Sequence, residues 1–273
     1  MVIIADAGST KIDWAVNKPN GISYYTSSGW NPTQDPTDLQ IDDKELEAYL
    51  LDCTSLYYYG TGLGSKEGHD RAMAQLKKMA PISDIHVATD LLGAARALFN
   101  TSDGITTIIG TGSNVCYYDG QNLQQATPSL GYLLSDEGSG FAIGKSIIKD
   151  FFYRRMPRET HELFLEKYTL SKEDLLKTLY HSPRPNAAIA QYTRFLVEVD
   201  NEWKNTLLRG HFDHLIKEKI LRHKNFLSVP VGFTGSIADI YSDILKEACA
   251  AYDIHHTTII ANPIESLVAF HTS

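Results

Sequence analysis

The feature that most constrains this fold is a local pattern that occurs twice. An apolar run, a turn of small residues and an alternating run follow one another at residues 2–14, and the same order returns at residues 107–118. Each copy is typical of a β-hairpin, because a glycine-containing turn separates two strand-like segments. Alignment of the copies places residues 7–10 over residues 111–114. The repeat therefore predicts two related lobes, each an α/β domain built around one hairpin.

Each hairpin turn carries groups that suit a phosphate. Glycine permits the positive φ of a tight turn, and hydroxyls and turn N–H groups can donate to one anion. The nucleotide-binding candidates are Gly8, Ser9, Thr10 and Lys11 in the first turn and Gly110, Thr111, Gly112 and Ser113 in the second. Two such turns would hold the phosphates of one nucleotide from both sides, as phosphoryl transfer requires. For the first turn taken alone, an ordinary hairpin with a polar tip explains the residues equally well.

One acidic residue stands beside the first turn. Asp6 ends the apolar run and could hold a divalent cation through water, whereas Gly110 occupies the corresponding place in the second copy. The sequence therefore predicts one carboxylate, Asp6, that binds a divalent cation through water.

Composition limits the classes of partner. A chain of 273 residues with 43% apolar content can bury the core of one large domain or two lobes. A net charge of −8 without a basic run argues against nucleic-acid binding and favours small molecules. We find no charged and apolar leader and no apolar stretch of bilayer length, so we expect a cytoplasmic protein. Cys53, Cys116 and Cys249 are odd in number and far apart, and we expect buried thiols.

Hydrophobic periodicity gives a coarse map of the remaining elements. We expect strands at residues 24–28, 54–59, 85–87, 226–231 and 257–261, and helices at residues 42–51, 66–79, 143–151, 171–180 and 237–248. From Ile189, helical spacing continues for about thirty residues and is interrupted only by Gly210. His211 and His214 lie on this stretch without an acid or cysteine motif nearby, so we assign them a structural role.

A glycine-rich segment at residues 60–65 offers a competing reading. It lies between a predicted strand and a predicted helix, and an acid, Asp90, follows the next strand, as in dinucleotide-binding folds. The glycine spacing is Gly-x-Gly-x-Gly, however, and Asp90 lies further along the chain than the ribose-binding acid usually does. The repeated hairpin favours a nucleotide held by two phosphate turns instead.

Together these motifs resemble the actin-like ATPase and sugar kinase superfamily, and most closely its N-acetylglucosamine kinase and BadF-type ATPase branch. The resemblance spans the whole chain and is strongest at residues 131–144, around Asp136-Glu137-Gly138-Ser139. It implies a two-lobed actin-like (ribonuclease H-like) fold of duplicated mixed-sheet domains, with ATP and Mg²⁺ in a cleft between them. We expect lobes at residues 1–104 and 105–261, with a last helix at about 262–273 that packs back on the first lobe.

The resemblance also implies roles for individual residues. Asp90 falls where such kinases keep the catalytic base, although the residue type equally suits an N-cap for the following helix. Asn31, Gly131 and Asp136, with Asp90, correspond to the sugar-binding positions. As alternatives, Asn31 before Pro32 suits a turn, and acids near Asp136 suit the start of a helix.

The adenosine motif of the family corresponds to Gly232, Gly235 and Ser236. Many α/β units also turn from strand to helix in this way without binding a ligand.

The sequence departs from its relatives near the expected sugar pocket. Ser129, Leu130 and Ser135 replace residues common in the family, so ATP is a firmer expectation than N-acetylglucosamine. The expected activity is an ATP-dependent sugar kinase, with a small sugar and ATP as partners; a homodimer is compatible with the sequence. The alternatives are a BadF-type ATPase or activator, and a non-catalytic sugar or nucleotide sensor on the same fold.

Overall fold

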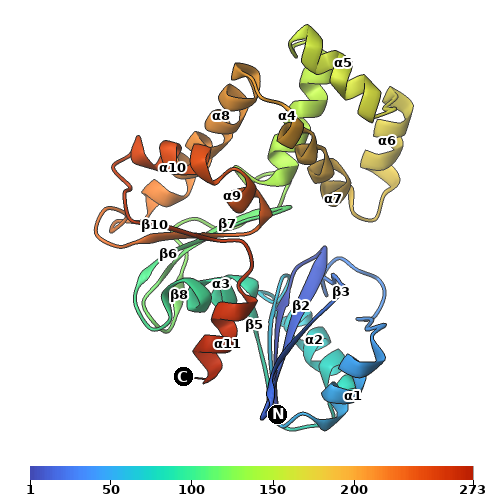
Figure 1. Cartoon of the computed structure of the whole chain (residues 1–273), viewed down its shortest axis with the longest axis vertical. Coiled ribbons are helices and arrows are strands. Elements are labelled where there is room, and N and C mark those ends of the chain that lie inside the picture. The colour runs from blue at the N-terminus through green and yellow to red at the C-terminus, as the bar shows by residue number, and fades with distance from the viewer. Residues whose placement is uncertain (273) are drawn as a thin grey trace. The chain divides into compact units, whose positions relative to one another are not determined.

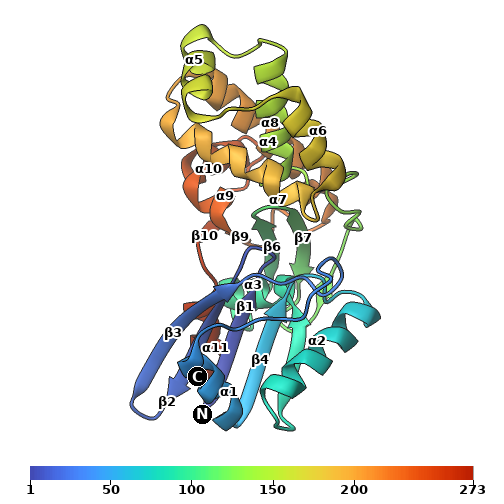
Figure 2. The ribbon, with the colours of Figure 1, turned by 90° about the vertical axis from the view of Figure 1, so that its right-hand side faces the viewer.

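The computed structural model describes residues 1–272, which form two units. The first contains Met1–Gly104, Tyr118–Leu123 and the chain from Asn262 onward; the second contains Ile105–Tyr117 and Gln124–Ala261. Each unit has its own sheet of five strands. Figures 1 and 2 show the elements of each.

The first unit begins with the predicted hairpin. Its elements are β1 (Val2–Ala7), β2 (Lys11–Lys18), β3 (Gly21–Ser28), α1 (Lys44–Asp52), β4 (Ser55–Gly60), α2 (Lys66–Met79), β5 (Ile85–Thr89), α3 (Asp90–Phe99) and α11 (Ile264–Thr272). The strand order is β3-β2-β1-β4-β5, with β1 antiparallel to β2 and parallel to β4. The carboxyl ends of β1, β4 and β5 therefore meet at one edge of the sheet.

The alternation of β1 sends its side chains to two different cores. Ile3 and Ala5 pack with apolar residues of α1 and α2, whereas Ile4 packs with residues of α11. Asp6 shares the face of Ile4, because residues two apart on a strand point to the same side. The helix α11 belongs to the first unit and buries Leu267 against this face.

The second unit repeats the strand plan of the first. Its elements are β6 (Gly104–Ile109), β7 (Ser113–Tyr118), β8 (Leu123–Gln124), α4 (Gly140–Phe152), α5 (Arg158–Lys167), α6 (Lys172–His181), α7 (Pro185–Ala190), the 3₁₀ helix η1 (Gln191–Glu198), α8 (Glu202–Glu218), the 3₁₀ helix η2 (Ile220–Arg222), β9 (Val231–Thr234), α9 (Ser236–Ile240), α10 (Ser242–Ala250) and β10 (Thr257–Ile260). The strand order of its sheet is β10-β9-β6-β7-β8. If β6 to β10 are counted as the first to fifth strands of this unit, the order is the same as β5-β4-β1-β2-β3 in the first unit. The duplicated mixed-sheet α/β fold is therefore confirmed.

Three predicted elements were wrong in detail. The strand expected at residues 226–231 is β9 at Val231–Thr234, because a turn in which Ser228 N–H donates to the Asn225 carbonyl precedes it. The long helical stretch breaks at Val199–Asn201, where Asn201 caps α8, and not at Gly210, which lies inside α8. The helix expected at residues 237–248 is divided between α9 and α10, which leaves Ile240 exposed.

Two further observations bear on the expectations from composition. All three cysteines are buried and free, as predicted. Within residues 1–272, no helix combines the length and the apolar character needed to cross a bilayer.

Candidate functional site

The first candidate phosphate turn is a tight turn that is also bonded by the segment after β3. Gly8 N–H donates to the Lys11 carbonyl over 2.9 Å, which closes the turn between β1 and β2. Two amides from the segment after β3 then bond the turn, because Gly29 N–H donates to the Thr10 carbonyl and Trp30 N–H donates to the Gly8 carbonyl. Three backbone hydrogen bonds, two of them from Gly29 and Trp30, thus fix the turn backbone.

Gly29 is where this packing tolerates no side chain. A Cβ at Gly29 would lie 2.4 Å from backbone atoms of Ser9 and Thr10. We expect Gly29→Ala to displace the turn, to lower the free energy of unfolding of the first unit by about 1–3 kcal/mol and to weaken nucleotide binding. Urea unfolding and nucleotide titration measure both effects. Gly64→Ala is the control, because a Cβ there meets nothing within 4 Å; equal behaviour of the two variants would contradict the prediction.

Three carboxylates gather at the carboxyl edge of the first sheet. Asp6 lies directly opposite Asp13 in the β1–β2 ladder, and Asp90 follows β5. Burial raises the pKa of Asp6 to about 7, and the negative charges of Asp90 and Asp13 add to this effect while Lys11 opposes it. A site with this concentration of negative charge suits a cation.

Lys11 and Asp13 form an ion pair within this group. Asp13, only 7% exposed, also accepts hydrogen bonds from Thr26 Oγ1 and from Asn262 Nδ2, the latter over 2.8 Å. The Lys11 ammonium, predicted to bind nucleotide, is therefore engaged by Asp13 in this structure. Asp6 has no such cation at bonding distance among the described residues.

Asp90 is not the cap of its helix. Thr89 is the N-cap of α3, and its Oγ1 accepts from Leu92 N–H. Asp90 instead accepts from Leu91 N–H through Oδ1 over 2.8 Å and from the hydroxyl of Thr61. Burial raises the pKa of Asp90 above its usual value, against the opposing effect of these hydrogen bonds. The capping alternative is thereby excluded, and the Asp90 carboxyl remains partly buried beside Asp6.

Asn31 lies buried in the loop that follows Trp30. Its Oδ1 accepts from Thr33 N–H at 3.0 Å and from Thr33 Oγ1 at 2.8 Å. The oxygen of the Asn31 amide therefore stabilises the turn, as the turn alternative predicts. Its Nδ2 carries no hydrogen bond to the described residues. Gly62 approaches so closely that a Cβ there would lie 2.2 Å from Asn31 Oδ1. Gly62 and its neighbour Thr61 therefore connect Asn31 with Asp90.

The second candidate phosphate turn is bonded by the start of the helix α4. Gly110 N–H donates to the Gly112 carbonyl, and the first residues of α4 bond the turn in return. Gly140 N–H donates to the Gly110 carbonyl over 2.8 Å, and Phe141 N–H donates to the Thr111 carbonyl over 3.0 Å. Ser139 caps α4 through its hydroxyl, so the helix begins later than residues 136–138.

Asp136 lies against this second turn. Its carboxylate accepts from Ser113 N–H, and a Cβ on Gly112 would lie 2.5 Å from its Oδ2. Burial raises the pKa of Asp136 to about 6, with a further contribution from Glu137. Ser113 Oγ donates to the Glu137 carbonyl over 2.7 Å. Both donors of Ser113 are therefore committed to the loop that carries Asp136.

The remaining candidates lie near the same turn or apart from it. Gly235, at a φ of 101°, packs so that a Cβ would lie 2.6 Å from the Ile109 carbonyl, and the exposed Ser236 follows it. Gly232 lies inside the buried strand β9 and not in the turn. Gly131 has a φ of 75° and no neighbour within 4 Å of a Cβ.

The geometry fits a magnesium–nucleotide complex without a preformed metal cage. Among residues 1–272, no cluster of three or more His, Cys, Asp or Glu side chains could hold a metal ion by itself. Mg²⁺ is usually bound by one or two carboxylates together with phosphate oxygens and water, which the carboxylate of Asp6 beside the Gly8 turn can accommodate.

Four residues that pack on the candidate site residues or their loops were not predicted from sequence, and each acts through a contact distant in the chain. Gly29 and Lys219 belong to no motif. Thr61 and Gly62 lie in the glycine-rich segment at residues 60–65, which the sequence offered as a competing dinucleotide motif.

Comparisons with known proteins identify the fold and its relatives. No family model and no curated protein matches the chain. A solved structure described as a putative N-acetylglucosamine kinase from Porphyromonas gingivalis has 31% sequence identity, a TM-score of 0.88 and coverage of 99% of this chain and 98% of its own.

More distant structures share the fold alone. One, described as a putative N-acetylglucosamine kinase from Chromobacterium violaceum, has 15% identity, a TM-score of 0.67 and coverage of 98% of each chain. A ROK family glucokinase from Streptomyces griseus, solved with glucose and AMPPNP, has 12% identity, a TM-score of 0.52 and coverage of 98% of this chain and 97% of its own. This chain is similar to the Porphyromonas gingivalis protein over nearly the full length of both, which shows that it belongs to the N-acetylglucosamine kinase family of the actin-like ATPase superfamily.

Proposed function

We propose that this protein is an ATP-dependent kinase that phosphorylates a hydroxyl of a small sugar, with N-acetylglucosamine as the first acceptor to test. The observation that carries the proposal is the state of Asp90. Thr89 caps α3 in its place, and the Asp90 carboxyl stands partly buried beside Asp6 at the end of β5. The names of the Porphyromonas gingivalis and Chromobacterium violaceum proteins point to the same acceptor.

In this proposal each unit contributes a defined set of groups. The first unit supplies Asp90 as general base, Asn31 Nδ2 as a donor to the sugar and the turn at Gly8 for phosphate. The second supplies the Asp136 carboxylate as an acceptor for sugar hydroxyls and the turn at Gly110 for phosphate. An ionised carboxylate is a strong acceptor for hydroxyl groups, which supports the role of Asp136.

The chemical step follows from these roles. The acceptor hydroxyl oxygen forms a bond to the γ-phosphorus, the bond between that phosphorus and the β,γ-bridging oxygen breaks, and ADP leaves. Asp90 accepts the hydroxyl proton, for which its raised pKa makes it a better base than an ordinary aspartate. Mg²⁺ held beside Asp6 through water would neutralise charge on the phosphates. ATP as the donor also agrees with a cytoplasmic location, which we retain as part of the proposal.

The test is ADP release from ATP and Mg²⁺ with a panel of acceptors. We expect N-acetylglucosamine to stimulate release at least about tenfold over the reaction without acceptor, because water lacks the binding contacts that orient a sugar hydroxyl. Glucose, N-acetylmannosamine and glucosamine complete the panel, and phosphosugar detection by mass spectrometry identifies the product. Stimulation by another sugar would keep the kinase and change its substrate. Equal release with every acceptor would indicate an ATPase, and binding without release would indicate a sensor.

A further inference from the structure

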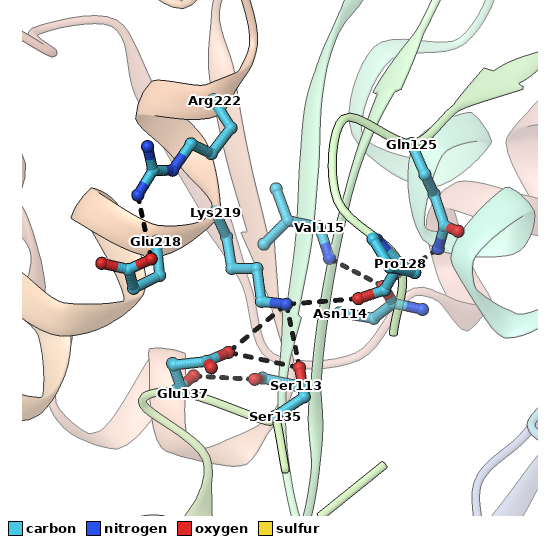
Figure 3. A network of polar contacts seen from close by, with 10 residues as sticks. All are labelled: Ser113, Asn114, Val115, Gln125, Pro128, Ser135, Glu137, Glu218, Lys219 and Arg222. Atoms are coloured by element: carbon cyan, nitrogen blue, oxygen red, sulfur yellow. Dashed lines mark hydrogen bonds and ion pairs between the residues drawn. The ribbon is translucent and has the colours of Figure 1, made fainter. Parts of the chain in front are cut away.

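The end of α8 carries a lysine that is almost completely covered. Lys219 is the C-cap residue of α8, and its side chain is only 13% exposed. Its ammonium contacts three oxygens of one loop, as Figure 3 shows: Ser135 Oγ at 2.8 Å, the Pro128 carbonyl at 3.4 Å and Glu137 Oε2 at 3.5 Å. The ammonium therefore joins the end of α8 to both sides of Asp136 in the chain.

The loop needs such an anchor because its own apolar packing is weak. Leu133 and Leu134 are 74% and 76% exposed, and only Tyr132 packs on the core, through an edge contact with Phe141. Asp136 itself has a φ of 63°, a conformation that costs free energy for a residue with a Cβ. Polar contacts, and not apolar burial, must therefore fix the Asp136 carboxylate.

Two anchors from different elements share this task. Ser113, at the start of β7, donates to the Asp136 carboxylate and to the Glu137 carbonyl. Lys219, at the end of α8, donates to Ser135 Oγ and pairs with the Glu137 carboxylate. Figure 3 shows dashed lines that join Glu137 to both Ser113 and Lys219. Removal of either anchor leaves the loop attached on one side.

A buried ammonium is a poor means of stabilising a fold. The cost of removing the charges of Lys219 and Glu137 from water largely cancels their attraction. Apolar residues often replace such ion pairs without loss of stability. A lysine at this position is better explained by the placement of the loop it holds.

We propose that Lys219 is a positioning residue that sets the affinity for the acceptor sugar by holding the loop at Ser135–Glu137, so that the Asp136 carboxylate is presented in one orientation. The inference rests on the proposed kinase function and on the role of Asp136 in binding the sugar. It adds that α8, through its C-cap residue, controls acceptor binding, whereas the Gly110 turn keeps its separate hydrogen bonds from Gly140 and Phe141 N–H.

The test compares Lys219→Met with Lys217→Met. Lys217 is on the same helix, is 53% exposed and pairs with Asp213, so its replacement removes an equal charge without touching the loop. We expect Lys219→Met to raise the KM for the sugar by about 10–50-fold, with kcat and the KM for ATP within about threefold of wild type. Lys217→Met should leave all three unchanged.

The pH profile provides a readout that a general loss of stability would not produce. The charged groups that act on the Asp136 carboxyl are Glu137, which raises its pKa, and Lys219, which lowers it. Loss of the Lys219 charge should therefore move the acid limb of kcat/KM for the sugar to higher pH. Lys219→Arg keeps the charge and should leave the limb near its wild-type position.

Hydrogen exchange on the protein without substrate separates this inference from the kinase proposal. Faster exchange of the amides at 134–137 in Lys219→Met, with unchanged exchange in the core of β6, supports the anchoring role even if no acceptor is found. A wild-type enzyme that no acceptor stimulates overturns the function, whereas wild-type stimulation with an unchanged sugar KM in Lys219→Met overturns the role of Lys219. If Lys219→Met does not fold, Ser135→Ala removes the 2.8 Å contact with Lys219 together with the 3.4 Å hydrogen bond from Ser135 Oγ to Glu137 Oε2, and an unchanged sugar KM there overturns the role of Lys219 equally.

Discussion

Replacement of Asp90 by Asn should lower kcat by about 10³-fold, within the range of 10²–10⁴ that general-base catalysis contributes. The amide keeps the shape of the carboxyl and can still accept from Leu91 N–H, but it cannot take the proton of the attacking hydroxyl. The dissociation constant for ATP should stay within about twofold, because the proposed phosphate contacts lie elsewhere. Acceptor-dependent ADP release and nucleotide titration measure the two quantities.

The structure supplies a control for a merely structural effect. Because Thr89 caps α3 and burial disfavours the charge on Asp90, the free energy of unfolding should not fall in Asp90→Asn. Thr89→Ala should instead lower it by about 1 kcal/mol, the usual value for loss of an N-cap. An Asp90→Asn enzyme that retains more than a tenth of the wild-type kcat would remove Asp90 from the role of base.

Asp136→Asn should act on binding and on stability in opposite directions. The KM for the sugar should rise by about 100-fold, because charge-assisted hydrogen bonds to the sugar hydroxyls contribute about 1.5–3 kcal/mol each. The free energy of unfolding at neutral pH should increase by about 1–3 kcal/mol, because Asn carries no charge to desolvate and can still accept from Ser113 N–H.

The sign of the pH dependence follows from the same shift. Burial raises the pKa of Asp136 from 3.8 to about 6, so the folded protein binds a proton that the unfolded chain releases between these values. The destabilisation by Asp136 is therefore complete above pH 6 and is relieved as the pH falls toward 4. The stability advantage of Asp136→Asn should shrink over the same interval. Thermal unfolding from pH 4 to 8 measures it, with the exposed Asp243→Asn as control; an advantage that grows toward low pH would contradict the assignment.

The repeat allowed most of the architecture to be predicted, because it identified the two strands on which each sheet is built. The turn at Gly8 and the helix α2 could be predicted from local chemistry, because Gly8 and the N-cap residue Ser65 each form a hydrogen bond with a residue only a few positions away. The helix α5 was missed, because its N-cap residue, Pro157, offers no side-chain cap to recognise. The shift of β9 depended on a turn near Asn225 that no sequence motif indicated.

The sequence offered candidate site residues only where a motif or a residue's own chemistry marked them. Asp6 was proposed because a carboxylate beside a glycine turn suits a cation, and Asp90 and Asp136 because their segments resemble those of the family; their roles stay predictions. Gly29 and Lys219 were not found, because their effect depends on partners 19 and 84 positions away, Thr10 and Ser135. Such contacts are set by topology, which periodicity does not specify.

The helix α11 has a consequence for the order in which the chain can fold during synthesis. It covers the face of the first sheet that carries Ile4 and Ala15, and Asn262 just before it bonds Asp13. The first sheet is made early, yet the ribosome must translate the whole second unit before this covering helix emerges. Until then Ile4 and Ala15 lack their packing against Leu267 and Val268, and such a transient apolar surface is the kind that chaperones bind. Its carboxylate Asp13 acquires the Asn262 amide as a partner only after the second unit has been translated.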